Sequence, residues 1–308
     1  MAFFSSLLNA APGAIAQGLL WGIMAIGVYI TYRILDVADL TVDGSLATGG
    51  AVCVMLMRSG CDPWLALMCA FLVGLLAGMA TGLLHTRCGI PAILAGILTQ
   101  LALYSVNLRI MGKANQPINA NNYRLLVSSR NVKALSVENP ILVVGIVCLV
   151  VIALLYWFFG TELGCALRST GSNPAMSRAQ GINVDFNKVL GLMLSNGLVA
   201  LSSALLSQYQ GFADVSMGRG AIVIGLAAVI IGDVIFSKVF TNFALKLLSV
   251  VIGSVIYYAV YSLVIWLGMS GDDMKLITSL IVALFLSIPY WKGKYFSKPA
   301  KKGGAANA

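Results

Sequence analysis

A polar segment from Gly160 to Lys188 carries the residues of this chain that are best suited to docking another protein. Asn173 is a strong helix N-cap, because its side-chain oxygen can accept a hydrogen bond from a backbone N–H of the first turn. Pro174 fits the first helical position, and Gly181 can adopt the left-handed conformation that ends a helix. We therefore predict a lone two-turn helix over 174–180. Two turns are too few for stability in water, so we expect this helix to dock against a partner protein.

A stripe of small and polar side chains follows one face of a predicted helix over 189–208. Its members are Asn196, Ala200, Ser203, Ser207 and Gln210. Offsets of three or four residues place them on one helix face, which can line a solute path or pack against another helix through hydrogen bonds. The sequence leaves both interpretations in place. Gly74, Gly78 and Gly82 form a second stripe without polar atoms, for which we predict packing.

The composition places these residues in a membrane. The chain has 308 residues, of which 59% are hydrophobic and 10% charged, and its mean hydropathy is +0.91. Apolar stretches recur at roughly the 20-residue length that crosses a hydrocarbon core of about 30 Å. The first stretch follows no basic region and precedes no small-residue cleavage site, so we expect a retained membrane helix rather than a cleaved signal.

We predict an all-α integral membrane protein, a single domain over 1–308 with about nine transmembrane helices. The predicted spans are 14–34, 44–57, 63–85, 90–110, 140–159, 189–208, 220–236, 243–267 and 274–289. The second and seventh spans are short. Both are expected to be half-helices that follow non-helical backbone, which a membrane protein tolerates only where it is buried inside protein.

The distribution of lysine and arginine predicts the orientation. The tail over 292–308 carries Lys292, Lys294, Lys298, Lys301 and Lys302, and the segment over 160–188 is also basic, so both are expected in the cytoplasm. Four predicted spans separate them, which agrees with this assignment. The N-terminus and the loop over 112–139 then lie outside, although that loop carries four basic residues of its own.

The sequence also lacks the motifs of several other functions. It contains no GxxxxGK[ST] phosphate loop, so any ATP must be bound by a separate subunit. Its lone histidine, His85, lies at a predicted helix end beside Arg87, whereas ion-coupled carriers usually hold acidic or histidine sites deep in the membrane. The six cysteines form no CxxC pair. We expect no catalytic residue, no metal site and no cofactor.

Five charged residues lie close to the two predicted half-helices: Asp39, Asp43, Asp214, Arg219 and Asp233. A charge near the bilayer centre costs about 2.5–3.5 kcal/mol on insertion scales, so each is expected to be paired, hydrated or at an interface. Asp43 precedes the first half-helix, and its negative charge would be stabilised by the helix dipole. Capping of that helix and contact with a solute are the two roles considered for Asp43.

The surroundings of the two half-helices are similar. The segment Ala38–Gly44 before the first resembles Ala213–Gly220 before the second, because each has an acidic residue, an apolar and hydroxyl pair, and then glycine. Under the predicted topology the first segment lies toward the cytoplasm and the second toward the outside. This arrangement is the one that an inverted repeat requires.

The segment Gly164–Asn183, with the sequence GCALRSTGSNPAMSRAQGIN, resembles the cytoplasmic coupling segment of bacterial ABC-importer permeases of the branched-chain amino acid and ribose type. The segment Asp214–Asp233 is similar to the permeases associated with tryptophan or tyrosine uptake. The resemblance covers nearly the whole chain. It implies a bacterial plasma (inner) membrane protein that pairs with a second permease copy, two ABC ATPase subunits and an extracytoplasmic substrate-binding protein. Besides these partners we expect the lipid bilayer and no nucleic acid.

The resemblance implies one set of functional residues, and the polar stripe and the charges near the half-helices suggest a second. The ATPase-coupling set is Arg168, Asn173, Pro174, Arg178 and Gly181, and the transport-path set is Asp43, Asn196, Ser203, Ser207 and Asp214. The function expected is import of a small solute, with an aromatic amino acid the best choice. A stand-alone ion-coupled secondary transporter and a passive channel are the alternatives, but neither needs the capped segment.

Overall fold

The computed structural model describes residues 2–118, 123, 125–132, 139–236, 239–266 and, near the C-terminus, 276, 279–280, 282–284 and 287. The longer helices are α1 (Ala2–Tyr29), which continues as the π-helix η1 (Ile30–Ile34), α2 (Thr41–Arg58), α3 (Pro63–Thr86), α4 (Ala92–Met111), α5 (Pro140–Gly160), α8 (Val184–Gln210), α9 (Ala221–Phe236) and α10 (Phe243–Trp266). The shorter elements are α6 (Glu162–Ser172), α7 (Pro174–Ala179), the 3₁₀ turn η2 (Ser129–Asn131) and the strands β1 (Asn115–Pro117) and β2 (Phe212–Asp214).

Within the described residues, six helices are long and apolar enough to cross a membrane: 11–34, α3, α4, α5, α8 and α10. The predicted spans over 44–57 and 220–236 form α2 and α9, of 18 and 16 residues. The predicted span over 274–289 lies mostly outside the described residues. The all-α membrane fold is therefore confirmed, whereas the count of nine spans is not.

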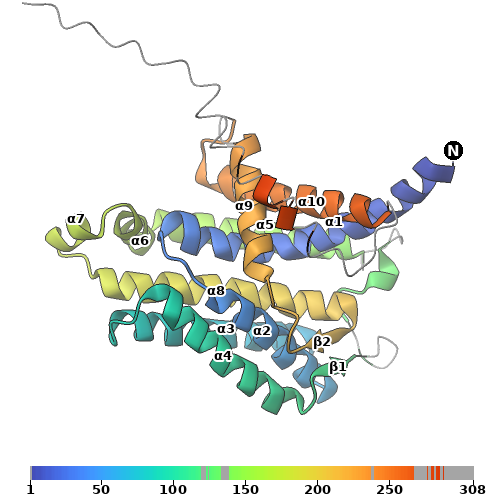
Figure 1. Ribbon diagram of the computed structural model, residues 1–308, viewed down its shortest axis with the longest axis horizontal. Helices are drawn as coiled ribbons and strands as arrows, with labels where there is room; N and C mark the ends of the chain where they lie inside the picture. The colour runs from blue at the N-terminus through green and yellow to red at the C-terminus, as the bar shows by residue number, and fades with distance from the viewer. Residues whose placement is uncertain are drawn as a thin grey trace, which may run out of the picture.

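Helix α8 is the centre of the molecule. It contacts α2 and α3 on one side and α1 on the other. Figure 1 shows two groups of helices on either side of α8, with α2, α3 and α4 in one group and α1, α5, α9 and α10 in the other. Because every group packs on α8, its small and polar face is covered by protein of the same chain.

The glycine stripe of α3 forms a tight seam with α8. A side chain at Gly78 would overlap the backbone of Leu192, and one at Gly74 would overlap the backbone of Asn196. Gly82 lies in the same way against Val189, where an added Cβ would be 2.9 Å from the Cα atom. The packing role that the sequence predicts for this stripe is confirmed, because only glycine allows the two helix backbones to approach this closely.

Both short helices follow non-helical backbone, over 36–40 before α2 and over 211–220 before α9, in which buried residues such as Asp39 and Ala213 alternate with exposed ones. Ser45 bonds to Asn196 and Gly49 packs on Ala200, so α2 and α8 run in the same direction.

Contacts of α1 give the direction of α9. Ser195 and Ser202 of α8 bond to Gly27 and Leu20 of α1, so these two helices are antiparallel. Gly225 packs on Val28, and Asp233 pairs with Arg33, so α9 ends at the same end of the molecule as α1, although Figure 1 shows the two helices crossing steeply. Helices α2 and α9 therefore point in opposite directions, as the predicted inverted repeat requires.

A two-stranded ribbon closes one end of the molecule. Strand β1, after α4, pairs antiparallel with β2, after α8, and Ile118 N donates to Gly211 O at 2.7 Å. Arg58 at the end of α2 donates to Gln116 of β1. Figure 1 shows the ribbon at the end opposite α6 and α7. The loop over 112–139, predicted to be non-helical, thus contains a strand and one 3₁₀ turn in its described part.

We predict that Gly78→Val lowers the free energy of unfolding by about 1–3 kcal/mol, because the added methyl groups force α3 away from α8. Thermal unfolding in detergent measures this change. Gly145→Val on α5 is the matched control, since an added Cβ there meets no atom within 4 Å of the described chain, and its effect should stay within about 0.5 kcal/mol. Equal stability of the two variants would show that the seam is loose.

Candidate functional site

A buried polar network joins the start of α2 to the middle of α8. Asp39 is 3% exposed, and its carboxylate accepts from Thr41 N at 2.9 Å and from the Asn196 side-chain amide at 2.7 Å. Asn196 in turn accepts from the Ser45 hydroxyl at 2.6 Å. A buried carboxylate is tolerated only with such partners. Asp39 therefore supplies the hydrogen bond that a helix beginning inside the protein needs at its N-terminus.

Asp43 does not cap its own helix, contrary to the prediction. Helix α2 begins at Thr41, before Asp43, because Asp39 already accepts the Thr41 N–H. The Asp43 carboxylate instead accepts from Gly220 N at 3.0 Å and from Ile222 N at 3.1 Å. It therefore caps α9, the half-helix of the other repeat, and also compensates the partial positive charge of that helix end.

Asp214 lies at the ribbon rather than between the half-helices. Its carboxylate accepts from Ser216 N at 2.7 Å, from the Ser216 hydroxyl and from the Asn115 amide at 3.3 Å. Burial alone would raise the pKa of Asp214, but these hydrogen bonds and the positive charge of Arg219 outweigh it, so the pKa lies below its usual value. Its contacts are those of a turn-forming residue, and its transport-path role stays a prediction.

The polar stripe of α8 is buried among helices of this chain except at Gln210, which is exposed. Ser203 and Ser207 are 0% exposed, and both hydroxyls lie 3.9 Å from the sulfur of Met217 in the segment before α9. Gly50 of α2 packs against the same two serines. Asn196 belongs to the Asp39 network described above. These contacts are those of a packing seam, and the path role of the stripe stays a prediction.

A cavity of about 320 Å³ opens beside the start of both half-helices. Its polar lining comes from Asp43 of α2, Arg219 before α9, and Gln100, Tyr104 and Asn107 of α4. Leu101, Ala47 and Val215 provide an apolar part. The volume is at the lower end of the range of roughly 300–1,000 Å³ that is typical of small-molecule sites. A carboxylate, a guanidinium and an amide around one cavity suit a zwitterionic solute.

Sequence analysis missed the α4 residues of this cavity, and Asn107 is the one among them whose side-chain polar atoms have no partner in the described part of the chain. It is 0% exposed, and neither its Oδ1 nor its Nδ2 has a hydrogen-bond partner within the described part of the chain. Such a group costs about 1–3 kcal/mol when it is left unsatisfied. The amide therefore lies at the wall of the cavity with its hydrogen-bonding capacity unused. No local pattern in the sequence distinguishes Asn107 from other polar residues of a membrane helix.

The polar segment contains two helices instead of the single predicted one. Helix α6 (Glu162–Ser172) precedes α7 and was not predicted; its N-cap is Thr161, whose hydroxyl accepts from Gly164 N at 3.4 Å. Leu167 and Thr170 bury one face of α6, and Thr170 accepts from the Asn187 amide of α8 at 3.0 Å. Because α6 is anchored in this way, it provides the support that a two-turn helix needs.

The end signals of α7 (Pro174–Ala179) are those expected from the sequence. Asn173 accepts from Met176 N at 3.0 Å, Pro174 is the first helical residue, and Gly181 has φ +80°. Of the α7 residues only Ser177 is buried, where its hydroxyl bonds to Ser169 of α6. Figure 1 shows α7 at the far end of the molecule, so its exposed surface is free for contact.

The two arginines of the predicted coupling set lie in different places. Arg178 forms an exposed ion pair with Asp185 at the start of α8, with N–O 3.3 Å. Arg168 turns away from α7, and its guanidinium carbon lies 4.3 Å from the ring centroid of Phe243. His85 bonds to the Ile90 carbonyl at 2.9 Å and has structural contacts. Among the described residues no three histidine, cysteine or acidic side chains converge on one point.

An apolar helical bundle with two inverted half-helices and a projecting helical segment at one end defines a membrane permease. The family of branched-chain amino acid transport system permease components matches residues 12–288, and this chain belongs to that family. The tyrosine transport system permease protein of Clostridioides difficile is 41% identical over 280 residues, which cover 91% of each chain. The ribose import permease protein of Escherichia coli is 27% identical and covers 68% of this chain and 64% of its own length.

The solved structure of PsaBC from Streptococcus pneumoniae in complex with Fab has the same fold. Its TM-score is 0.52 at 18% identity, and the match covers 95% of this chain and 99% of that one. Together with the family, the six apolar spans make this chain a multi-pass inner membrane protein and the permease component of an ABC-type importer of small solutes. Its relatives are transport permeases rather than enzymes.

We predict that Asp43→Ala lowers the free energy of unfolding by about 0.5–2 kcal/mol, the usual effect of removing an N-cap. Asp43→Asn should lower the free energy of unfolding by less, because its amide oxygen can still accept from one backbone N–H of α9. Thermal unfolding of the purified protein measures both changes. Asp185→Ala is the control, since it breaks only an exposed ion pair. A variant at Asp43 as stable as this control would contradict the capping role.

Proposed function

We propose that this chain forms the membrane path of an ATP-driven importer for an aromatic amino acid and performs no covalent chemistry itself. The observation that supports this most is the polar cavity beside the N-termini of two inverted half-helices. Interrupted helices near the midplane are where transporters of many folds bind their solutes. The similarity to a tyrosine transport permease favours an aromatic amino acid over a sugar.

The lining of the cavity suggests how such a solute would be held. The α-ammonium group would lie against the Asp43 carboxylate, and the α-carboxylate against the Arg219 guanidinium, which is exposed beside it. The unpartnered amide of Asn107 would bond to a polar group of the solute. Leu101 and Tyr104 would contact its ring. Each of these contacts uses the charge or hydrogen-bonding capacity of the residue.

The helices α6 and α7 would transmit the motion of an ABC ATPase. That ATPase is a separate subunit and would bind the ATP. Helix α7 projects from the bundle, whereas α6 packs on α5, α8 and η1. A force on α7 would reach the membrane helices through α6. Arg168, Asn173, Pro174, Arg178 and Gly181 would then shape this segment. A stand-alone carrier or channel has no use for such a projection.

The remaining partners follow from the same proposal. The end with α7 would face the cytoplasm together with the basic tail over 292–308, which lies outside the described residues. The ribbon end would then face an extracytoplasmic substrate-binding protein. A second permease copy would cover apolar side chains that this chain leaves exposed, such as Leu94 and Leu98 of α4.

We predict that Gly181→Val uncouples ATP hydrolysis from transport in vesicles reconstituted with the cognate ATPase and substrate-binding protein. Valine is strained at φ +80°, but an added Cβ there meets no atom of the described chain within 4 Å, so only the end of α7 should change. Solute-stimulated ATPase activity and uptake of labelled tyrosine are measured together. Gly160→Val is the control, because it has open space and an ordinary φ. Normal stimulation in the Gly181 variant would reject the coupling role.

We predict that Asn107→Leu lowers tyrosine uptake at least tenfold while the unfolding temperature stays equal or rises. Leucine removes two unsatisfied polar atoms from a buried site, so it should not destabilise the fold. Asn187→Leu is the matched control: it breaks the bond to Thr170 and should lower the unfolding temperature. Full uptake by the Asn107 variant would show that the solute does not use this cavity.

A further inference from the structure

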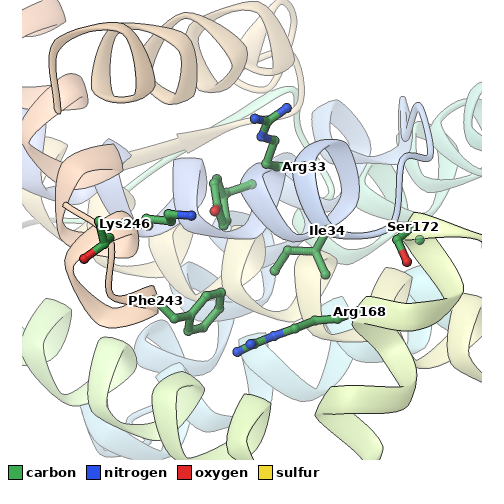
Figure 2. Close-up of a pocket in the computed structure, with 9 residues that line it drawn as sticks. Arg33, Ile34, Arg168, Ser172, Phe243 and Lys246 are labelled. Carbon is green, nitrogen blue, oxygen red and sulfur yellow. The ribbon is translucent and has the colours of Figure 1, made fainter. Parts of the chain in front are cut away.

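A second cavity, of about 430 Å³, lies at the end of the molecule that carries α7. Its walls come from three elements that are distant in sequence: η1 with the end of α1, the end of α6, and the start of α10. Figure 2 shows Arg33, Arg168 and Lys246 on these three elements, with Arg168 directed toward Phe243 and Arg33 directed away from Arg168. The solute path proposed above does not use this cavity.

The cavity has an excess of positive charge. Arg33, Arg168 and Lys246 are all exposed, and the acidic side chain that contacts them in the described part of the chain is Asp233. Its carboxylate lies 3.5 Å from the Arg33 Nε atom, and it also interacts with Lys246. Three cations against one carboxylate leave about two positive charges uncompensated. An anion of charge −1 or −2 would complete the site.

Arg168 is held in a geometry that suits an oxyanion. Its guanidinium lies over the Phe243 ring at 4.3 Å and near the Phe159 ring at 5.3 Å from the centroids. A cation–π contact uses the face of the guanidinium and restrains its rotation. Arg168 is exposed, so its N–H groups can still donate hydrogen bonds to a ligand. A guanidinium presented in this way matches two oxygens of a phosphate group.

Exposed apolar side chains flank the charged cavity on the same elements. Tyr32 next to Arg33 is 44% exposed, and Leu245 next to Lys246 is 38% exposed. These side chains belong to two helices, 11–34 and α10, that are long and apolar enough to cross a membrane. A ligand that fits both parts needs a phosphate head and an apolar tail.

We propose that this cavity binds the phosphate headgroup of an anionic phospholipid. Basic pockets between membrane helices at the cytoplasmic side are a recurring type of lipid site. One wall of the cavity is α6, which supports α7, so a bound lipid would hold η1, α6 and α10 together. The proposal does not depend on which solute is transported.

The test is a lipid titration of the full chain in detergent, read by native mass spectrometry and by thermal shift. Phosphatidylglycerol should bind at least tenfold more tightly than phosphatidylcholine. Arg33→Gln and Lys246→Gln should each weaken phosphatidylglycerol binding about fivefold or more. Arg87→Gln is the matched control, since it removes an exposed cation at the end of α3, outside the cavity, and should leave binding unchanged.

Lys246→Arg preserves the charge and should retain binding, which separates loss of charge from loss of folding. Equal binding of the two lipids would overturn the proposal, as would pocket variants that bind as tightly as the Arg87 variant. A further arm uses inorganic phosphate. If it displaces phosphatidylglycerol at equal concentration, the site is one for free anions, and the lipid assignment is wrong.

Discussion

A helix that begins inside an apolar interior leaves its first backbone N–H groups without partners, and the structure depends on how two such helices are satisfied. Asp39 accepts from the start of α2, and Asp43 accepts from the start of α9. The hydrogen bonds from α9 to Asp43 join the two repeats, so neither repeat satisfies its helix ends alone. This arrangement also places two carboxylates in a membrane helix bundle, where a charge is unfavourable. The polar network with Asn196 stabilises Asp39, and Asp43 borders the open cavity.

Close backbone approach makes this arrangement possible. Glycines of α2 and α3 bring both helices against α8, and the serines of α8 then bond to the carbonyls of Gly27 and Leu20 in α1. Helix α8 therefore contacts both groups of helices, α1 through Ser195 and Ser202 and α2 through the neighbouring face that carries Asn196 and Ala200. Larger side chains at these positions would separate the helices and break the hydrogen bonds together, because in a membrane no water replaces them.

Local features of the sequence predicted much of this. Apolar length gave most described spans to within a few residues, and Asn173, Pro174 and Gly181 gave the ends of α7 within one residue, because hydropathy and capping depend on neighbours in sequence. Helix α6 was missed because its eleven residues are mainly polar and its cap, Thr161, directly follows an apolar span. The bond from Asp43 to α9 and the unpartnered amide of Asn107 arise from packing between distant segments, which a single sequence does not reveal.

The bonds of Asp39 and Asp43 also have a consequence for biosynthesis. The amide that bonds to Asp39 is 157 residues later in the chain, and the N–H groups that bond to Asp43 are 177 and 179 residues later. During synthesis the first half of the protein therefore reaches the membrane with both carboxylates lacking these partners. Until α8 and α9 have been synthesised, Asp39 and Asp43 lack these hydrogen bonds, so the start of α2 must stay in contact with water or the insertion machinery.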